Sequence, residues 1–297
     1  MAHTLLIGIM MRSMLLRFLF CVLVLSASPA YSALNAYEPF DYTPVGSDLL
    51  GDNGGFGFSA PWNTGGFNAF INTNYDVASG SLSFGSLLTQ GNSVSTGPVS
   101  QIAGLTRDLA VPLGVPGTTA YVSFLLQPQG TLGEGVFNGF FGLTLESPDE
   151  PEVFMGKPGG DALDKYVIEY RGGANQHPSS VTPEVGQTTL IVVRADFGLP
   201  GFDDTFTMFA NPVPGGAEPL VGDVLSANVS TITGLTLYSS GAYAIDELRV
   251  GDTFADVTPT VSTVPEGGPG LPLLTFAVAF VFVLRYYFDV KSGLLRH

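Results

Sequence analysis

Short runs in which apolar and polar residues alternate follow one another from about residue 82 to residue 250. Alternation with a period of two residues is typical of a β-strand that has one buried face. The chain between residues 34 and 260 contains no eleven-residue stretch with the apolar spacing of a helix. The pattern therefore predicts an all-β domain. Its expected strands are Leu82–Leu88, Asn92–Ser95, Leu105–Leu113, Thr118–Leu126, Phe137–Leu145, Glu152–Met155, Tyr166–Tyr170, Thr188–Phe197, Thr205–Phe209, Leu235–Tyr238 and Ala244–Val250.

Glycine and proline separate these runs, as at Gly159-Gly160, Gly172-Gly173 and Pro200-Gly201. Short strands that alternate with such turns are typical of an antiparallel sandwich or barrel. The sequence shows no repeat of fixed period, which argues against a propeller or a solenoid. We predict an antiparallel sandwich or barrel over residues 34–257.

The start of the chain has the pattern of a secretory signal peptide. Arg12 and Arg17 precede an eight-residue apolar run, Phe18–Leu25, and small residues follow at Ala30 and Ser32. The apolar run is too short to cross a bilayer, which takes about 20 residues. We expect residues 1–33 to be removed after export, and with them Cys21, the one cysteine in the chain. The mature domain then contains no disulfide and no cysteine nucleophile.

The other end carries a second apolar run. A Thr/Ser/Pro-rich segment, residues 258–263, is predicted to be an extended, exposed linker. The run Leu271–Leu284 follows, with Arg285 directly after it. Fourteen helical residues span only about 21 Å, short of a hydrocarbon core of about 30 Å. Tyrosines after Arg285 suit the headgroup level, so we predict a short membrane helix over residues 271–288.

The charge of the chain limits its partners. Between Leu34 and Thr260 there are six basic and twenty-four acidic residues. Nucleic acids and anionic lipids are bound by clustered lysine and arginine, so we expect this domain to bind neither.

Candidate catalytic residues are sparse in the predicted domain. His177 is its one histidine, which is too few for a histidine-based zinc site, and we expect it on a surface loop. Asp149-Glu150-Pro151-Glu152 comes nearest to a pair of glycosidase carboxylates, but its turn context predicts a solvated loop. Asp246 and Glu247 are adjacent, which predicts opposite faces of a strand and no catalytic pair.

Two ligand sites remain as alternatives. Asp203, Asp204 and the region of Asp246 could together bind Ca²⁺, because hard cations take carboxylate oxygens. Otherwise we expect no metal and no cofactor. Trp62, the only tryptophan, is expected to pack in the core, with a sugar-binding aromatic platform as the alternative.

Val264-Pro265-Glu266, the apolar run after it and Arg285 resemble the PEP-CTERM class of C-terminal sorting signals of Gram-negative bacteria. The resemblance implies that an exosortase, a membrane cysteine protease-transpeptidase, recognises residues 264–297 and processes the chain near Pro265 and Glu266. Gly267 stands where this class commonly has proline. The resemblance covers about thirty residues.

The central domain resembles the concanavalin A-like and laminin-G-like jelly rolls of secreted bacterial proteins. The residues that carry this likeness are Asp76–Gly80, Ile191–Arg194 and Ile245–Gly251. The resemblance implies a jelly roll that closes with an Asp-Glu-apolar-Arg strand.

The sequence thus predicts an exported protein of the cell surface or extracellular matrix, held in the membrane transiently or permanently by its tail. We expect it to be non-catalytic and interpret it as a binder of exopolysaccharide. A glycoside hydrolase or polysaccharide lyase on the same fold is the alternative.

Overall fold

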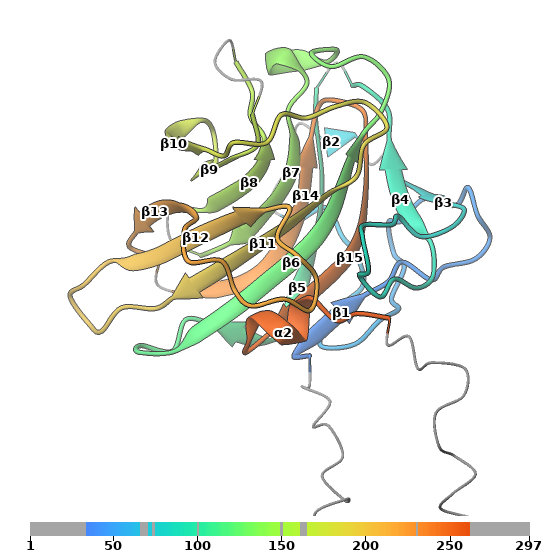
Figure 1. The fold of residues 1–297 in the computed structure, drawn as a ribbon. Helices are drawn as coiled ribbons and strands as arrows, with labels where there is room; N and C mark the ends of the chain where they lie inside the picture. Colours follow the sequence, from blue (N-terminus) through green and yellow to red (C-terminus); the bar gives the residue numbers. More distant parts are fainter. Residues whose placement is uncertain are drawn as a thin grey trace, which may run out of the picture. The chain divides into compact units, whose positions relative to one another are not determined.

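A computed structural model describes residues 34–65, 71–72, 75–99, 101–148, 151–160, 165–229 and 231–261. Two β-sheets make up this part of the chain (Figure 1), which confirms the predicted all-β sandwich. The eight-stranded sheet runs β13 (Asp223–Ala227), β12 (Asp204–Ala210), β11 (Thr189–Asp196), β6 (Thr119–Pro128), β15 (Tyr243–Gly251), β4 (Ser93–Thr96) and β3 (Asp76–Ala78), with β1 (Ala36–Glu38) also paired to β15. The seven-stranded sheet runs β10 (Ala174–Pro178), β9 (Val167–Tyr170), β8 (Val153–Lys157), β7 (Phe141–Glu146), β14 (Ile232–Ser239), β5 (Ile102–Leu113) and β2 (Ile71–Asn72).

The chain crosses between the sheets several times, since β5, β7 and β14 lie in one sheet and β6, β11 and β15 in the other. The named strands pair antiparallel, as predicted, except for one short parallel pair between β2 and β5. Two short helical turns accompany the sheets, η1 (Val136–Asn138) and α2 (Phe254–Val257).

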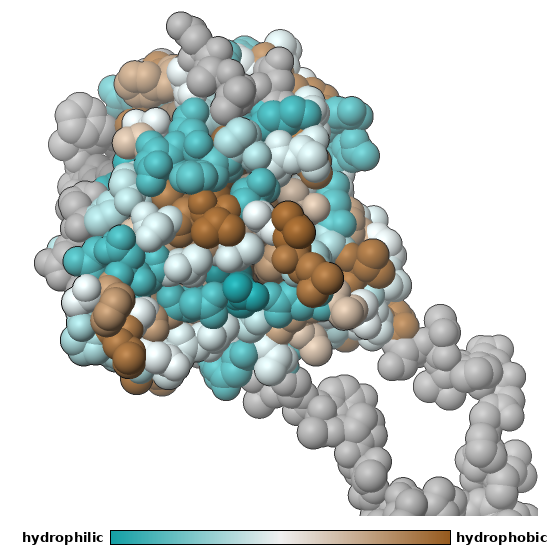
Figure 2. All heavy atoms as spheres, turned by 60° about the vertical axis from the view of Figure 1, so that its left-hand side comes forward, coloured by the Kyte–Doolittle hydropathy of each residue, from teal (hydrophilic) through white to brown (hydrophobic). Residues whose placement is uncertain are grey.

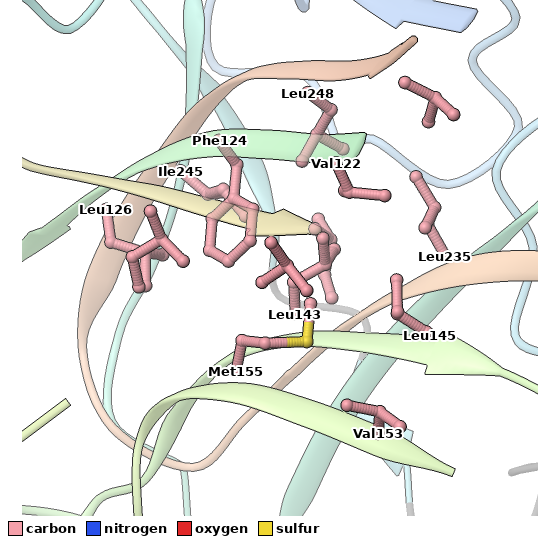
Figure 3. Close-up of a cluster of buried hydrophobic side chains, with 14 of the residues drawn as sticks. Val122, Phe124, Leu126, Leu143, Leu145, Val153, Met155, Leu235, Ile245 and Leu248 are labelled. Carbon is pink, nitrogen blue, oxygen red and sulfur yellow. The ribbon is translucent and has the colours of Figure 1, made fainter. Parts of the chain in front are cut away.

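The core lies between the sheets because every second residue of each strand faces inward. Figure 3 shows side chains of β6, such as Phe124, directed toward those of β7 and β8, such as Leu143 and Met155. These three side chains are fully buried. Burial of such a side chain stabilises the fold by roughly 1.5–3 kcal/mol, so a core of this size holds the domain without disulfides.

Most of the predicted strands are confirmed, but the run Leu82–Leu88 is wrong. That segment is irregular and contributes one isolated bridge, from Leu87 to Thr260. Its apolar residues pack on the outer face of the eight-stranded sheet, which explains their strand-like pattern. Five of the strands that the structure describes were not predicted. Three of them, β1, β2 and β3, have only two or three residues. The other two, β10 and β13, lie at sheet edges and consist mostly of polar or small residues.

The sandwich also continues past Val257, and the predicted exposure of residues 258–260 is wrong. Thr258 is buried, and its hydroxyl donates to the carbonyl of Phe254 over 2.8 Å. Pro259 accepts a hydrogen bond from the backbone N–H of Leu88 at 2.8 Å. These contacts hold Thr258 and Pro259 against the sandwich.

Candidate functional site: a groove on the outer face of the seven-stranded sheet

The outer face of the eight-stranded sheet is covered by other parts of the chain. Leu125, Leu190 and Val192 pack there against α2 and against the segment around Leu87. Figure 1 places α2 against this sheet, and its contacts are with β6, β11 and β15. This covering leaves the outer face of the seven-stranded sheet as the other broad face on which a ligand could bind.

Alternation along the strands decides which side chains reach that second face. In β9, Ile168 packs in the core between the sheets, whereas Val167 belongs to a separate apolar cluster. In β8 the same holds for Met155 and Phe154. The register pairs Phe154 with Glu169, so these two lie side by side on the outer face.

Three aromatic rings form the floor of a groove of about 500 Å³ on this face. The ring centroids of Phe140 and Tyr238 are 4.8 Å apart, and Phe154 lies 6.4 Å from Phe140 and 6.3 Å from Tyr238. Phe140 and Phe154 are buried, while Tyr238 is half-buried and presents part of its ring to the groove. Edge-to-face contacts of this kind hold rings rigidly in place.

Phe137, a fourth aromatic residue, lines the same groove and is 65% exposed. It belongs to η1 and has a positive φ of 52°, a conformation that a bulky side chain rarely adopts. Asn138 and Gly139 follow it with φ of 61° and 59°, and the carbonyl of Phe137 accepts from the N–H of Gly160 at 2.9 Å. The turn therefore holds an aromatic side chain in solvent at a cost in backbone strain, which is a common property of ligand sites.

A carboxylate and an amide stand beside the aromatic floor. Nε2 of Gln176 donates a hydrogen bond to Oε2 of Glu169 over 2.6 Å. Glu169 is 3% exposed, and burial raises its pKa to about 7, while the hydrogen bond from Gln176 opposes part of that rise. Both residues line the groove, so they can exchange hydrogen bonds with a polar ligand.

An ion pair lies next to Tyr238 on this face. Nε of Arg171 pairs with Oε2 of Glu152, and the guanidinium lies 5.7 Å from the centroid of the Tyr238 ring. Burial raises the pKa of the Tyr238 hydroxyl; the charge of Arg171 lowers it, and the charges of Glu152 and Glu146 raise it. These four residues are therefore close enough to influence one another electrostatically.

The prediction that Glu152 lies in a solvated loop is wrong. Glu152 is buried, because the chain turns into β8 directly after it and its carboxylate pairs with Arg171. Asp149 and Glu150, the other acids of that motif, lie outside the described residues.

The prediction that Asp246 and Glu247 face opposite ways is also wrong. The register of β15 shifts between Asp246 and Arg249, and Glu247 has a positive φ of 57°. This bulge turns both carboxylates to one side, where both accept hydrogen bonds from the hydroxyl of Ser81. Leu82 donates its N–H to Asp246 over 2.7 Å.

The Asp246–Glu247 cluster has a structural role. Tyr37 of β1 donates its hydroxyl to Glu247 over 2.9 Å, and Arg249 pairs with the same carboxylate. Burial raises the pKa of Asp246 to about 8, and the charge of Glu247 adds to the rise. The cluster fixes β1 and the segment after Gly80 to the closing strand.

The predicted alternative of a Ca²⁺ site that joins Asp203, Asp204 and Asp246 is not supported. Strands β11 and β6 lie between β12 and β15, which separates the two regions by about 14 Å at the usual strand spacing. Asp204 accepts instead from the N–H groups of Gly198 and Val229, at 2.7 and 3.0 Å. Within the described part of the chain, no group of three or more His, Cys, Asp and Glu residues could hold a metal ion.

Trp62 and His177 have the surroundings of structural residues. Trp62 is 1% exposed and stacks on Phe40 with 5.9 Å between the centroids, which confirms the core prediction and rules out a sugar platform at Trp62. His177 is half-exposed and lies on the edge strand β10 rather than in a loop.

The predicted sorting residues Val264, Pro265, Glu266 and Arg285 lie outside the described residues, as do the signal peptide and the apolar run of the tail. Of the helices that the structure describes, none is both long and apolar enough for a membrane span.

Sequence analysis missed the groove, although it predicted the strands of Glu169 and Tyr238. One signal was present: the strand Tyr166–Tyr170 is apolar at nearly every position and has a single acid in its middle. A strand that is apolar on both faces indicates burial on both, and an acid there must be desolvated. The partners of that acid come from β8, β10 and β14, which no local pattern links to it.

Comparison with known proteins gives no family for this chain. No protein-family model and no curated protein matches it. Among solved structures, a GH131 β-glucanase catalytic domain from Podospora anserina is similar, with a TM-score of 0.43 and 9% identity over 75% of this chain and 99% of that one. An endo-β-1,4-glucuronan lyase from Trichoderma reesei has a TM-score of 0.38 and 12% identity, over 67% of this chain and 97% of the other. The lectin UEA-II in complex with galactose has a TM-score of 0.33 and 11% identity, over 62% and 94%. Because these TM-scores are below 0.5, the fold assignment rests on the two sheets of this chain.

Proposed function

We propose that this chain is an exported, lectin-like jelly-roll protein that binds a polysaccharide in the groove of the seven-stranded sheet. The observation that carries the proposal is Phe137, an exposed aromatic side chain held over an aromatic floor by a strained turn. A protein gains nothing in stability from exposing such a ring, so a ligand is the simplest reason for it.

The chemistry of the groove favours a sugar chain over a purely apolar ligand. The C–H face of a sugar ring packs on an aromatic face such as that of Tyr238, and sugar hydroxyls bond to carboxylates and amides such as those of Glu169 and Gln176. A small apolar ligand would be better served by a closed cavity without a buried acid.

Removal of the Phe137 ring tests this proposal. The full-length chain is screened on an array of polysaccharides and oligosaccharides, and the tightest ligand is titrated by calorimetry. We expect Phe137→Ala to weaken binding about tenfold, equivalent to about 1.4 kcal/mol of lost contact. The fold should persist, because the side chain is mostly in solvent.

Phe202→Ala is the matched control, because Phe202 is 72% exposed but belongs to the connection between β11 and β12 of the other sheet. It should leave the affinity unchanged. Absence of any glycan ligand, or equal effects of the two substitutions, would contradict the proposal.

A glycan-active enzyme is the second candidate, because the groove face carries two carboxylates in different environments. Phe154 pairs with Glu169, and the carbonyl of Glu152 accepts from the N–H of Arg171, so Glu152 and Glu169 are diagonal neighbours on one face. The pKa of Glu169 is raised, whereas Glu152 has a cationic partner. Such a pair could divide the roles of acid and base. Release of reducing ends or unsaturated products, abolished in Glu169→Gln, would favour the enzyme over the binding protein.

The cellular location of the protein is part of the same proposal. The motif Val264-Pro265-Glu266, the apolar run and Arg285 support recognition of the tail by an exosortase-type enzyme, and residues 1–33 support export. Exopolysaccharide at the cell surface or in the matrix would then be the ligand that the domain meets.

A further inference from the structure

Acidic side chains outnumber basic ones on the face that carries the groove. Asp108 and Glu146 are both paired with Gly234, which places them in one row across β5, β14 and β7. Glu152, directly before β8, and Glu169 of β9 add two more carboxylates. Arg171 stands among them, but its guanidinium is paired with Glu152. Among the residues that the structure describes, we thus find on this face four carboxylates and one guanidinium that is already paired.

The groove itself offers a ligand no positive side chain. None of the described residues that line it is lysine or arginine. The nearest lysine on the same strands, Lys157, is buried, and its ammonium donates to the carbonyl of Asn138 over 2.6 Å. A polyanionic glycan would therefore bring like charge toward Glu169 without a cation to offset it.

Glu169 is placed to receive a cation. Its side chain is enclosed by apolar groups, with Phe154 opposite it in the sheet, and one oxygen accepts from Gln176. A carboxylate with one neutral donor gains much more from an arriving ammonium than a solvated one does, because the local dielectric is low. The rings of Tyr238 and Phe137 add attraction, since the face of an aromatic ring favours a cation.

We propose that the polysaccharide bound in this groove carries free amino groups, and that Glu169 pairs with one of its ammonium groups. The inference rests on the proposed glycan-binding function and names the ligand class for that site. Polyuronates are excluded by the acidic face, and fully N-acetylated chains lack the charge that Glu169 needs. A neutral glycan would use the aromatic floor and hydrogen bonds from its hydroxyls, without an ion pair to Glu169.

Proton linkage offers a readout of the pairing. The charged groups that act on Tyr238, which lines the groove with Glu169, are Arg171, Glu152 and Glu146, and of these only Arg171 would favour ionisation of a neighbouring acid. Burial holds the pKa of Glu169 near 7, so part of the population is protonated at neutral pH. Pairing should then lower the pKa of Glu169 and release protons from it, while a ligand amine that is neutral in solution takes up a proton as it binds. Buffers of different ionisation enthalpy detect the net exchange in calorimetry, and Glu169→Gln should remove the part that comes from Glu169.

The decisive experiment compares four hexasaccharides with the purified full-length chain: glucosamine, N-acetylglucosamine, glucose and glucuronate hexamers. We expect the glucosamine hexamer to bind at least about tenfold more tightly than its N-acetylated form, with an advantage that declines as salt is added. Glu169→Gln should reduce this preference to about twofold or less. Asp196→Asn, which removes a carboxylate that pairs with Arg194 on the other sheet, should leave the preference unchanged.

Equal binding of the amino and N-acetylated hexamers, or tightest binding of the glucuronate hexamer, would overturn the inference. If Phe137→Ala still weakened the binding of these hexamers, the groove would remain a glycan site and only the proposed ligand class would be wrong. If none of the hexamers and no glycan on the array bound, the proposed function itself would fail. The salt dependence of glucosamine-hexamer binding to the unsubstituted chain gives a second readout, which does not depend on whether the Glu169→Gln variant folds.

Discussion

Arg107 and Glu38 form a buried ion pair that joins β5 to β1 and to the loops after it. Trp62 and the hydroxyl of Tyr42 also donate to Glu38, at 3.2 and 2.7 Å. Arg107 donates further to the side chain of Asn53 at 2.8 Å. Burial raises the pKa of Glu38, and the hydroxyl of Tyr42 and the charge of Arg107 oppose this rise. The pair is stable because its hydrogen bonds replace the water that each charge has lost.

Loss of one partner should therefore be costly. We expect Arg107→Met to lower the free energy of unfolding by about 3–5 kcal/mol, because it leaves the Glu38 carboxylate buried without a cation. Arg194→Met is the matched control: Arg194 is about one-third exposed and pairs with Asp196 and Glu218, so its loss should cost less than about 1 kcal/mol. Urea unfolding followed by circular dichroism measures both, and equal losses would refute the distinction.

Single residues show where local sequence reasoning is reliable. The prediction for Trp62 was right because a large apolar side chain near many turns has few alternatives to the core. The prediction for Asp246 and Glu247 was wrong because a bulge cannot be read from an alternating pattern.

At the scale of elements, a row of small residues shapes the floor of the groove. Gly156, Gly142 and Gly104 lie in one register row across the seven-stranded sheet, with Tyr238 between Gly142 and Gly104. The Tyr238 ring therefore has glycine on both sides in its row. At Gly142 the strands come so close that a Cβ would stand 2.1 Å from the carbonyl oxygen of Met155.

Alanine at two positions of this row should differ in its cost to stability. Gly142→Ala forces β7 and β8 apart, and we expect it to cost about 2–3 kcal/mol of stability and to weaken ligand binding. At Gly104 a Cβ would find its nearest neighbour, the carbonyl oxygen of Leu237, at 3.5 Å, an ordinary contact. Gly104→Ala should cost less than about 1 kcal/mol. Thermal unfolding compares the two, and similar melting temperatures would contradict the register.

Element prediction succeeded for apolar strands inside the sheets and failed at the sheet edges. β11 and β15 were evident from their apolar content, whereas β10 consists of Ala-Asn-Gln-His-Pro and has no apolar face of its own. Figure 2, which brings the side with β10 and β13 forward, shows apolar patches bordered by polar side chains. Such edges are defined by their neighbours in the sheet and not by local preference.

At the scale of the whole molecule, the acidic domain stands between two ends with apolar runs. Residues 264–297 should retain an exported reporter in the membrane fraction until a processing enzyme releases it, because the run is apolar and ends in Arg285. Replacement of Pro265 and Glu266 by alanine should abolish processing and leave the reporter in the membrane. Fractionation and immunoblotting measure this, with Ser292→Ala as the control within the tail. Release of a reporter that lacks the tail at the same rate as one that carries it would refute the sorting role.

The sequence by itself determined the class of fold, since alternation and turns specify most of the strands, although not the irregular run Leu82–Leu88. It also determined the acidic surface and the two apolar ends, because these are properties of composition and order. Only the tertiary structure decided the site. Glu169 becomes a buried carboxylate when β8 brings Phe154 and β10 brings Gln176 beside it, and Tyr238 becomes its floor when β14 pairs with β7. These contacts join residues up to 98 positions apart, as for Ser239 and Phe141, and they exist only after the sheet has formed.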